Sequence, residues 1–233
     1  AEGRNANVSS DGIFALANQN LGGGNIIRNS LLGGATGDAL GSFGFSFIDA
    51  DSVLVRVPLA DVGGIVDAGS ALMVNASLQL RGRTDGTSAN EQYGTNLQSL
   101  SNGKLLFRSA NADIGGLTDA GVVKVVDPDT GNLVGQTAGT SANERFGDNF
   151  ANSLGNNGFI IVSENADPGG LVDAGAVVQI SSDTGLEIQR IVGTSAGEQL
   201  GSFGFQSSGG RLIFGSPLAD VGGIVDAGRI VIF

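Results

Sequence analysis

Short apolar runs separated by glycine-rich turns recur along the chain. In each copy of the pattern, a Gly-Phe or Gly-Asn stretch leads into one apolar run, and a loop rich in Asp and Gly leads into the next. The first set of runs is Val53–Val57, Lys104–Arg108, Phe159–Val162 and Arg211–Phe214, and the second is Ala71–Val74, Val122–Val126, Ala176–Ile180 and Arg229–Phe233. No window shows a sustained apolar period of 3.6 residues. The pattern therefore predicts short strands and almost no helix.

The same glycine-rich turns recur at a regular spacing, which indicates an internal repeat. The segment ADVGGIVDAG, or a close variant, begins at residues 60, 112, 166 and 219, which gives a unit of roughly 53 residues. A second marker, GTSA followed two residues later by Glu, begins at Gly86, Gly139 and Gly193 and keeps the same phase. Turns at 127–131 and 182–185 add a hairpin into a fourth strand. Four strands per unit, with glycine at the tight turns, predict an all-β fold: a β-propeller of four four-stranded blades.

The last copy, LGSFGF...GRLIFGSPLADVGGIVDAGRIVIF, resembles the FG-GAP repeat of integrin α-subunit propellers and bacterial extracellular proteins. Phe203-Gly204 and Gly215-Ser216-Pro217 stand close to the two signatures of that family. The resemblance covers about residues 34–233 and implies a propeller on a secreted or cell-surface protein. The calcium loop of the family, of the type Asp-x-Asp-x-Asp-Gly, is absent in that form.

The repeat leaves residues 1–33 outside the four-copy domain at 34–233. The fourth copy stops after its third strand, at Phe233, while residues 25–33 have the apolar character of a fourth strand. We therefore expect residues 1–33 to be a closing or donor segment, with a partial extra blade. Ile26, Ile27 and Leu31 would pair with the strand ending at Phe233, within one chain or between chains.

Charge and composition exclude several classes of function. The net charge of -11 repels phosphate backbones, so nucleic acid is not an expected partner. No apolar run reaches the length of a membrane span. The chain has no His and no Cys, which removes the usual nucleophile pairs and zinc ligand sets. The remaining acids recur in every copy rather than being placed once, so no catalytic residue is predicted and the chain is not expected to be an enzyme.

The Asp-x-Gly-Gly-x-x-Asp-Ala-Gly loop carries two carboxylates in each copy. Glycines between them let backbone carbonyls turn inward, and calcium prefers such oxygen ligands. Alternatively, each Asp accepts backbone N–H groups in an Asx-turn, a purely structural role. The calcium candidates are Asp61, Asp67, Asp113, Asp119, Asp167, Asp173, Asp220 and Asp226.

Two other sets of charged residues recur. A third acidic position is occupied by Asp38, Glu91, Glu144 and Glu198. Arg56 and Arg108 stand at equivalent strand ends, where they would bind an anion or a partner, or pair with neighbouring Asp residues.

These features predict an extracellular structural or adhesive repeat module, a self-assembling subunit of a surface layer or filament, whose partner is a second copy of itself. The alternative is a discrete receptor domain that binds a carbohydrate or a protein ligand at the cell surface.

Overall fold

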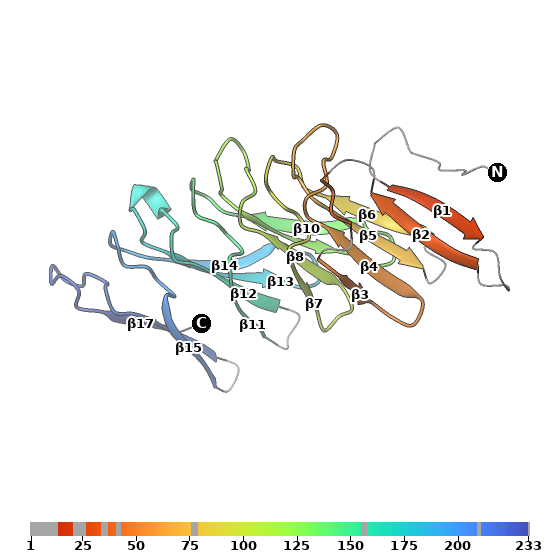
Figure 1. Ribbon diagram of the computed structural model, residues 1–233. Helices are drawn as coiled ribbons and strands as arrows, with labels where there is room; N and C mark the ends of the chain where they lie inside the picture. The colour runs from red at the N-terminus through yellow and green to blue at the C-terminus, as the bar shows by residue number, and fades with distance from the viewer. Residues whose placement is uncertain are drawn as a thin grey trace. The chain divides into compact units, whose positions relative to one another are not determined.

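The computed structural model of the protein describes residues 14–20, 27–33, 37–40, 43–75, 79–154, 158–208 and 211–232. Their regular structure is almost entirely antiparallel β-sheet (Figure 1). The one helix among them is a single 3-10 turn, Pro168–Gly170, so no described helix could span a membrane. The predictions of an all-β fold and of almost no helix are confirmed for these residues.

Each repeat forms its own sheet, and neighbours in sequence are neighbours in the sheet. The first contains β3 (Phe45–Phe47), β4 (Ser52–Val57), β5 (Ser70–Asn75) and β6 (Leu80–Asp85). The second contains β7 (Asn96–Ser99), β8 (Leu105–Ser109), β9 (Val122–Val126) and β10 (Leu133–Ala138). The third contains β11 (Asn149–Ser153), β12 (Gly158–Ser163), β13 (Ala176–Ser181) and β14 (Glu187–Val192). The fourth has three strands, β15 (Phe203–Ser208), β16 (Arg211–Ser216) and β17 (Arg229–Ile232).

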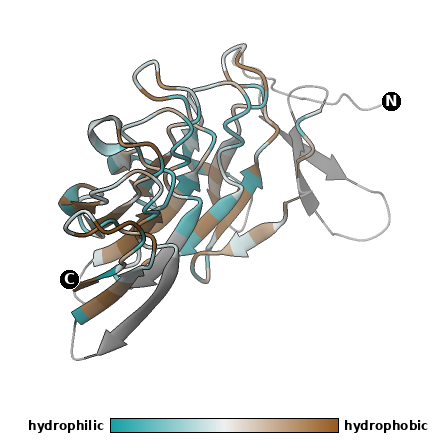
Figure 2. Ribbon diagram, turned by 90° about the vertical axis from the view of Figure 1, so that its left-hand side faces the viewer, coloured by the Kyte–Doolittle hydropathy of each residue, from teal (hydrophilic) through white to brown (hydrophobic). Residues whose placement is uncertain are grey.

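The chain divides into two units, residues 1–96 with 127–132, and residues 97–126 with 133–233. In the second unit, consecutive sheets bury their faces against each other. Phe159 and Ile161 of β12 pack with Val125 of the sheet before, while the alternate residue Ile160 packs with Phe214 of the sheet after. Alternation along a strand thus covers both faces of the third sheet. In Figure 2, brown hydrophobic stretches alternate with teal and white ones along the coloured strands.

In the first unit, Leu72 and Val74 of β5 form a core with Val55 and Val57 of β4, and Leu40 packs against it. This unit also holds a separate hairpin made of β1 (Phe14–Asn20) and β2 (Ile27–Gly33).

The hairpin changes the expectation for residues 25–33. Ile27 and Leu31 lie in β2, whose hydrogen-bonded neighbour is β1, with Leu31 opposite Leu16. Among the described residues, β17 pairs with β16, and no pairing with β2 is present. Ile26 and Phe233 lie outside the described residues. Because β1 already pairs with β2, the hairpin resembles the third and fourth strands of a preceding repeat more than a single closing strand. Pairing of residues 25–33 between chains stays a prediction.

Candidate interaction site: the loops between repeats

The loops carrying two aspartates, here called Asp-Gly loops, are residues 61–69, 113–121, 167–175 and 220–228. In each, the second Asp donates its backbone N–H to the first Asp's Oδ1, across 2.8 to 3.0 Å, in the pairs Asp67–Asp61, Asp119–Asp113, Asp173–Asp167 and Asp226–Asp220. The second Asp has a positive φ of 47 to 51° in all four loops. Asp is one of the few residues besides Gly that tolerate this conformation. The first carboxylate therefore closes the loop by accepting an N–H six residues on, whereas an Asx-turn would accept one two residues on. Its observed role is structural.

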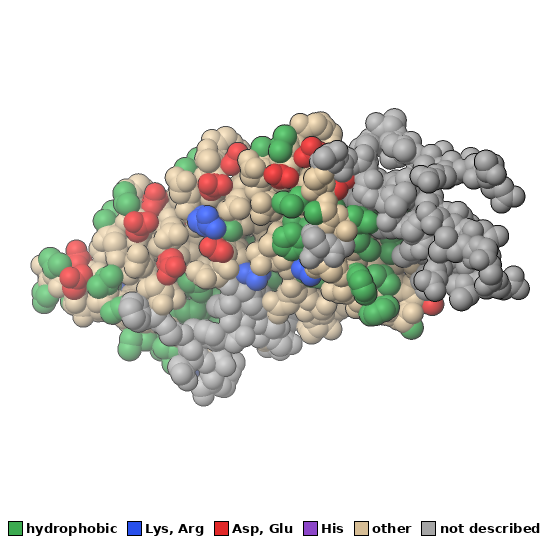
Figure 3. All heavy atoms as spheres, in the orientation of Figure 1, with side chains coloured by type: hydrophobic (Ala, Val, Ile, Leu, Met, Phe, Trp, Pro, Cys, Tyr) green, Lys and Arg blue, Asp and Glu red, His purple; other side chains and the backbone are tan. Residues whose placement is uncertain are grey.

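The described residues contain no group of three or more Asp, Glu, His or Cys side chains arranged to hold a metal ion. Acidic side chains recur on the face seen in Figure 3. One oxygen of the first Asp in each loop is engaged by the backbone, and binding of calcium by these loops stays a prediction.

We expect Asp167→Ala to lower the free energy of unfolding by about 1 kcal/mol, because Asp173 N–H loses its acceptor. Asp167→Asn keeps a side-chain oxygen at the same place and serves as the control. Urea denaturation of both variants measures the difference. Equal loss of stability in the two would show that charge, and not loop closure, is the role of Asp167.

The second set of loops, here called Glu loops, spans residues 86–93, 139–146 and 193–200. In each, the Glu is buried and its Oε2 accepts two backbone N–H groups, from the Thr and the Ser that precede it. For Glu144 these bonds are 2.5 Å to Thr140 N and 3.1 Å to Ser141 N, and Glu91 and Glu198 repeat them. The recurring acid at this position thus holds its own loop in shape. Asp38, in the first copy, is buried as well.

Each Glu loop is joined to the Asp-Gly loop before it by four backbone hydrogen bonds. In the second unit, the N–H groups of Gly139, Asn143, Arg145 and Phe146 donate to the carbonyl oxygens of residues 121, 118, 119 and 120, at 2.8 to 3.0 Å. Glu loop 86–93 makes the same four bonds to residues 66–69, and loop 193–200 makes them to residues 172–175. The carbonyl of the second Asp is one of the four acceptors. The positive φ of the second Asp is part of the loop conformation that presents these carbonyls to the next repeat.

The last residue of each Glu loop is a large apolar side chain that is fully buried: Tyr93, Phe146 or Leu200. The backbone of this residue passes close to a glycine of the Asp-Gly loop. A Cβ added to that glycine would lie less than 3.0 Å from main-chain atoms of the Glu loop. The glycines are Gly69, Gly121 and Gly175. Only glycine permits this junction, both for space and for its positive φ.

Arginines neutralise two of the buried glutamates. Arg190 Nη1 lies 3.7 Å from Glu144 Oε1, and its Nη2 donates to Ala138 O. Arg229 Nε lies 2.6 Å from Glu198 Oε1, and its Nη2 donates to Val192 O. Ala138 and Val192 occupy the same position in their repeats. Arg190 lies on the fourth strand of its sheet and Arg229 on the third strand of its own. Both nevertheless make the same pair of contacts, one to a buried Glu and one to the carbonyl just before its Glu loop.

Burial alone would raise the pKa of Glu198. Hydrogen bonds from Thr194 N–H, Ser216 Oγ–H and Arg229, together with the charge of Arg229, outweigh it and hold the pKa below its ordinary value. The carboxylate therefore stays charged in the folded protein at neutral pH.

Arg56 and Arg108 hold backbone carbonyls. Arg56 donates to Phe43 O at 2.6 Å and to Thr95 O at 3.2 Å, and Arg108 donates to Gly147 O at 2.7 Å and to Asp148 O at 3.1 Å. Burial lowers the pKa of Arg108, against the opposing charge of Asp148. Each guanidinium thus fastens the turn of the following repeat, a role that the sequence alone did not indicate.

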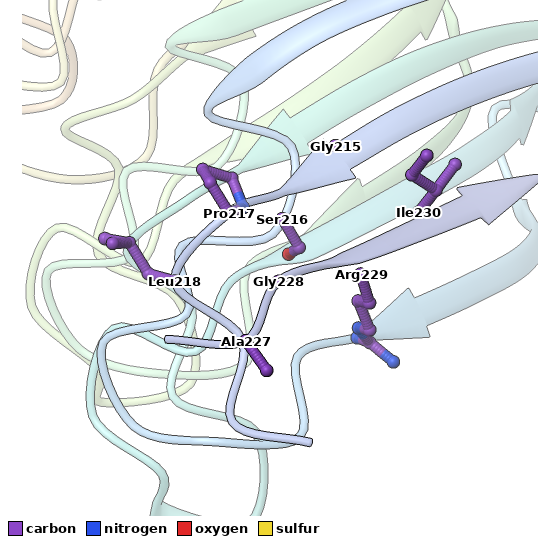
Figure 4. A pocket seen from close by; sticks show the side chains of 8 residues that line it. All are labelled: Gly215, Ser216, Pro217, Leu218, Ala227, Gly228, Arg229 and Ile230. Atoms are coloured by element: carbon purple, nitrogen blue, oxygen red, sulfur yellow. The ribbon is translucent and has the colours of Figure 1, made fainter. Parts of the chain in front are cut away.

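The fourth Asp-Gly loop differs from the other three. Within the described part of the chain, no N–H group donates to the carbonyls of Val225, Asp226, Ala227 and Gly228. Beside them lies a pocket of about 830 Å³, shown in Figure 4, between the end of β16 and the start of β17. It is lined by Gly215, Ser216, Pro217, Leu218, Ala227, Gly228, Arg229 and Ile230.

No family model matches the chain, and no curated protein matches it. Among solved structures, the chain is similar to the computationally designed Ika8 protein, with 14% sequence identity and a TM-score of 0.41. The match covers 94% of this chain and 55% of the designed chain, so the protein spans about half the length of that design. A similarity of this degree does not assign the chain to a family.

Proposed function

We propose that the protein is an extracellular structural or adhesive module, built as a β-propeller or an arc of propeller blades, whose copies associate with one another. Two features support the propeller arrangement. Consecutive sheets of the second unit pack face to face, and the last repeat resembles the FG-GAP family. That resemblance also supports a place outside the cell or on its surface.

The observation that carries self-association is the outer face of the fourth sheet. Ile230 and Ile232 on β17 are 74% and 57% exposed. The equivalent positions of β9 are Val123 and Val125, which are fully buried. In the third sheet, Val177 is buried against the fourth sheet. The same strand position is thus covered by the next sheet in the second and third sheets, and covering the two isoleucines of β17 in the same way would contribute about 3 to 6 kcal/mol.

No catalytic role is proposed. The buried carboxylates of Glu91, Glu144 and Glu198 are engaged by backbone N–H groups in every repeat that carries them. A role that recurs in each copy is a structural one, because chemistry is placed at single sites on a fold.

Analytical ultracentrifugation tests the proposal. We expect the full chain to associate reversibly, and Ile230→Asp with Ile232→Asp to weaken the association at least about tenfold, because each charge would be buried without a partner. Ile188→Asp on β14 is the matched control, since Ile188 is also 57% exposed but lies on an outer strand.

A wild-type protein that stays monomeric at every concentration would overturn self-association. Binding of that monomer to a glycan or protein array would then favour the receptor alternative. Electron micrographs of the wild-type protein would show whether the associated form is a closed ring or a filament.

A further inference from the structure

We propose that Asn102 is a modification site, at which hydrolysis of the side-chain amide releases a contact between the second and third sheets. Asn102 lies in the turn that joins β7 to β8, and Gly103 follows it. The sequence contains one other Asn-Gly pair, at 157–158, and Asn157 lies outside the described residues. The inference is independent of the proposed self-association.

The Asn102 side chain connects two turns that are 80 residues apart in the sequence. Its Nδ2 donates to Ser182 O at 2.9 Å and to Asp183 Oδ1 at 2.8 Å, in the turn between β13 and β14. Its Oδ1 accepts the N–H of Lys104 at 3.1 Å. An amide suits this place because it offers two N–H donors and an acceptor on one short side chain. The neutral amide therefore fastens the second sheet to the third at this turn.

The residue after Asn102 favours cyclisation of its side chain. Gly103 has no side chain to shield its backbone nitrogen, and nothing lies within 4 Å of its Cβ position. That nitrogen attacks Asn102 Cγ, the Cγ–Nδ2 bond breaks, and ammonia leaves with the amide proton of Gly103, which gives a cyclic imide. Water then opens the ring. Addition of water at Cγ gives aspartate, addition at the main-chain carbonyl gives isoaspartate, and neither step needs an oxidant or a reductant.

The folded turn holds this reaction back. Gly103 N–H donates to Leu100 O at 3.0 Å, and Leu100 N–H donates to Lys104 O at 2.8 Å, so the attacking nitrogen is held within the turn. The leaving amide is held by its two acceptors in the third sheet. Attack therefore requires the turn to open, and the rate follows the population of the open form.

Modification turns an attraction between the two turns into a repulsion. The new carboxylate donates no hydrogen bond to Ser182 O, and it faces the carboxylate of Asp183. Lys104 Nζ lies 3.8 Å from Asp183 Oδ1, so one ammonium would serve two carboxylates. Isoaspartate also adds a methylene group to the main chain of the turn. The apolar core that the two sheets share is left in place, so the effect is a local release of this contact.

Peptide mapping by mass spectrometry tests the reaction on the full chain, incubated at mildly alkaline pH either folded or in urea. We expect Asn102 to be converted at least about tenfold more slowly in the folded protein than in urea. Asp183→Ala removes one acceptor of the amide and should raise the rate in the folded protein by about threefold or more. Asp129→Ala is the matched control, because Asp129 occupies the equivalent place in the turn before β10 and should leave the rate unchanged.

Asn102→Asp carries the aspartate product from the start and tests its effect on the contact. We expect its melting temperature to fall by about 2 to 4 °C. Adding Asp183→Asn should recover about half of that shift, because it removes the pair of like charges.

The two measurements overturn different parts of the proposal. Equal rates with and without urea, no conversion in the folded protein, or an unchanged rate in Asp183→Ala would overturn the gated modification of Asn102. A melting temperature of Asn102→Asp equal to that of the wild-type protein, or no recovery on adding Asp183→Asn, would overturn the released contact.

Discussion

Gly121→Ala should lower the free energy of unfolding by about 3 kcal/mol. Gly121 has a φ of 80°, which costs an alanine about 1 to 2 kcal/mol. The new Cβ would also lie less than 3.0 Å from the main chain of Phe146, and relieving that contact costs about 1 to 3 kcal/mol more. The junction between two repeats would have to open, because backbone atoms cannot turn aside as a side chain can.

Gly116→Ala separates the two contributions. Gly116 lies in the same loop with a φ of 85°, but nothing lies within 4 Å of its Cβ position. This variant should lose only the conformational part, about 1 to 2 kcal/mol. Guanidinium denaturation monitored by circular dichroism measures both. Equal losses in the two variants would show that the close approach at Gly121 contributes nothing.

Glu198→Ala is expected to cost about 3 kcal/mol at neutral pH. The carboxylate is fully buried and accepts hydrogen bonds from Thr194 N–H, Ser216 Oγ–H and Arg229 Nε–H. Its removal leaves these donors, one of them charged, without an acceptor, which is among the more costly changes in a folded protein. Thermal unfolding of the variant beside Glu187→Ala checks this, since Glu187 is an exposed partner of Arg190 and should cost under about 1 kcal/mol.

The pH dependence of the same site has a definite sign. Because the pKa of Glu198 is lowered in the folded protein, its charge adds stability above the ordinary carboxyl value of 4.5. This contribution is lost as the pH falls through the lowered pKa. The difference in stability between the wild-type protein and Glu198→Gln should therefore be constant from pH 7 to about pH 5 and shrink below it. A difference that grows on acidification would contradict the assignment.

The amino-acid sequence by itself determined the local elements of this protein. Runs such as Val122–Val126 and Ala176–Ile180 form strands β9 and β13 because β-branched residues pack well on a pleated sheet that is buried on both faces. The Asp-Gly loops could also be predicted, because an Asp six residues before another and a Gly at a position of positive φ are short-range features.

Contacts between residues far apart in sequence were decided only by the tertiary structure. Arg56 and Arg108 bind carbonyls some 39 residues away, and their acceptors are backbone atoms that leave no mark in the sequence. The partner of β2 is β1, although the apolar residues of β2 would suit any open strand edge equally well. The carbonyls at 66–69 accept four N–H groups of Glu loop 86–93, which begins 17 residues further along the chain than the last of them. The loop sequence alone does not mark these acceptors, because a backbone carbonyl is paired by whatever the fold brings to it.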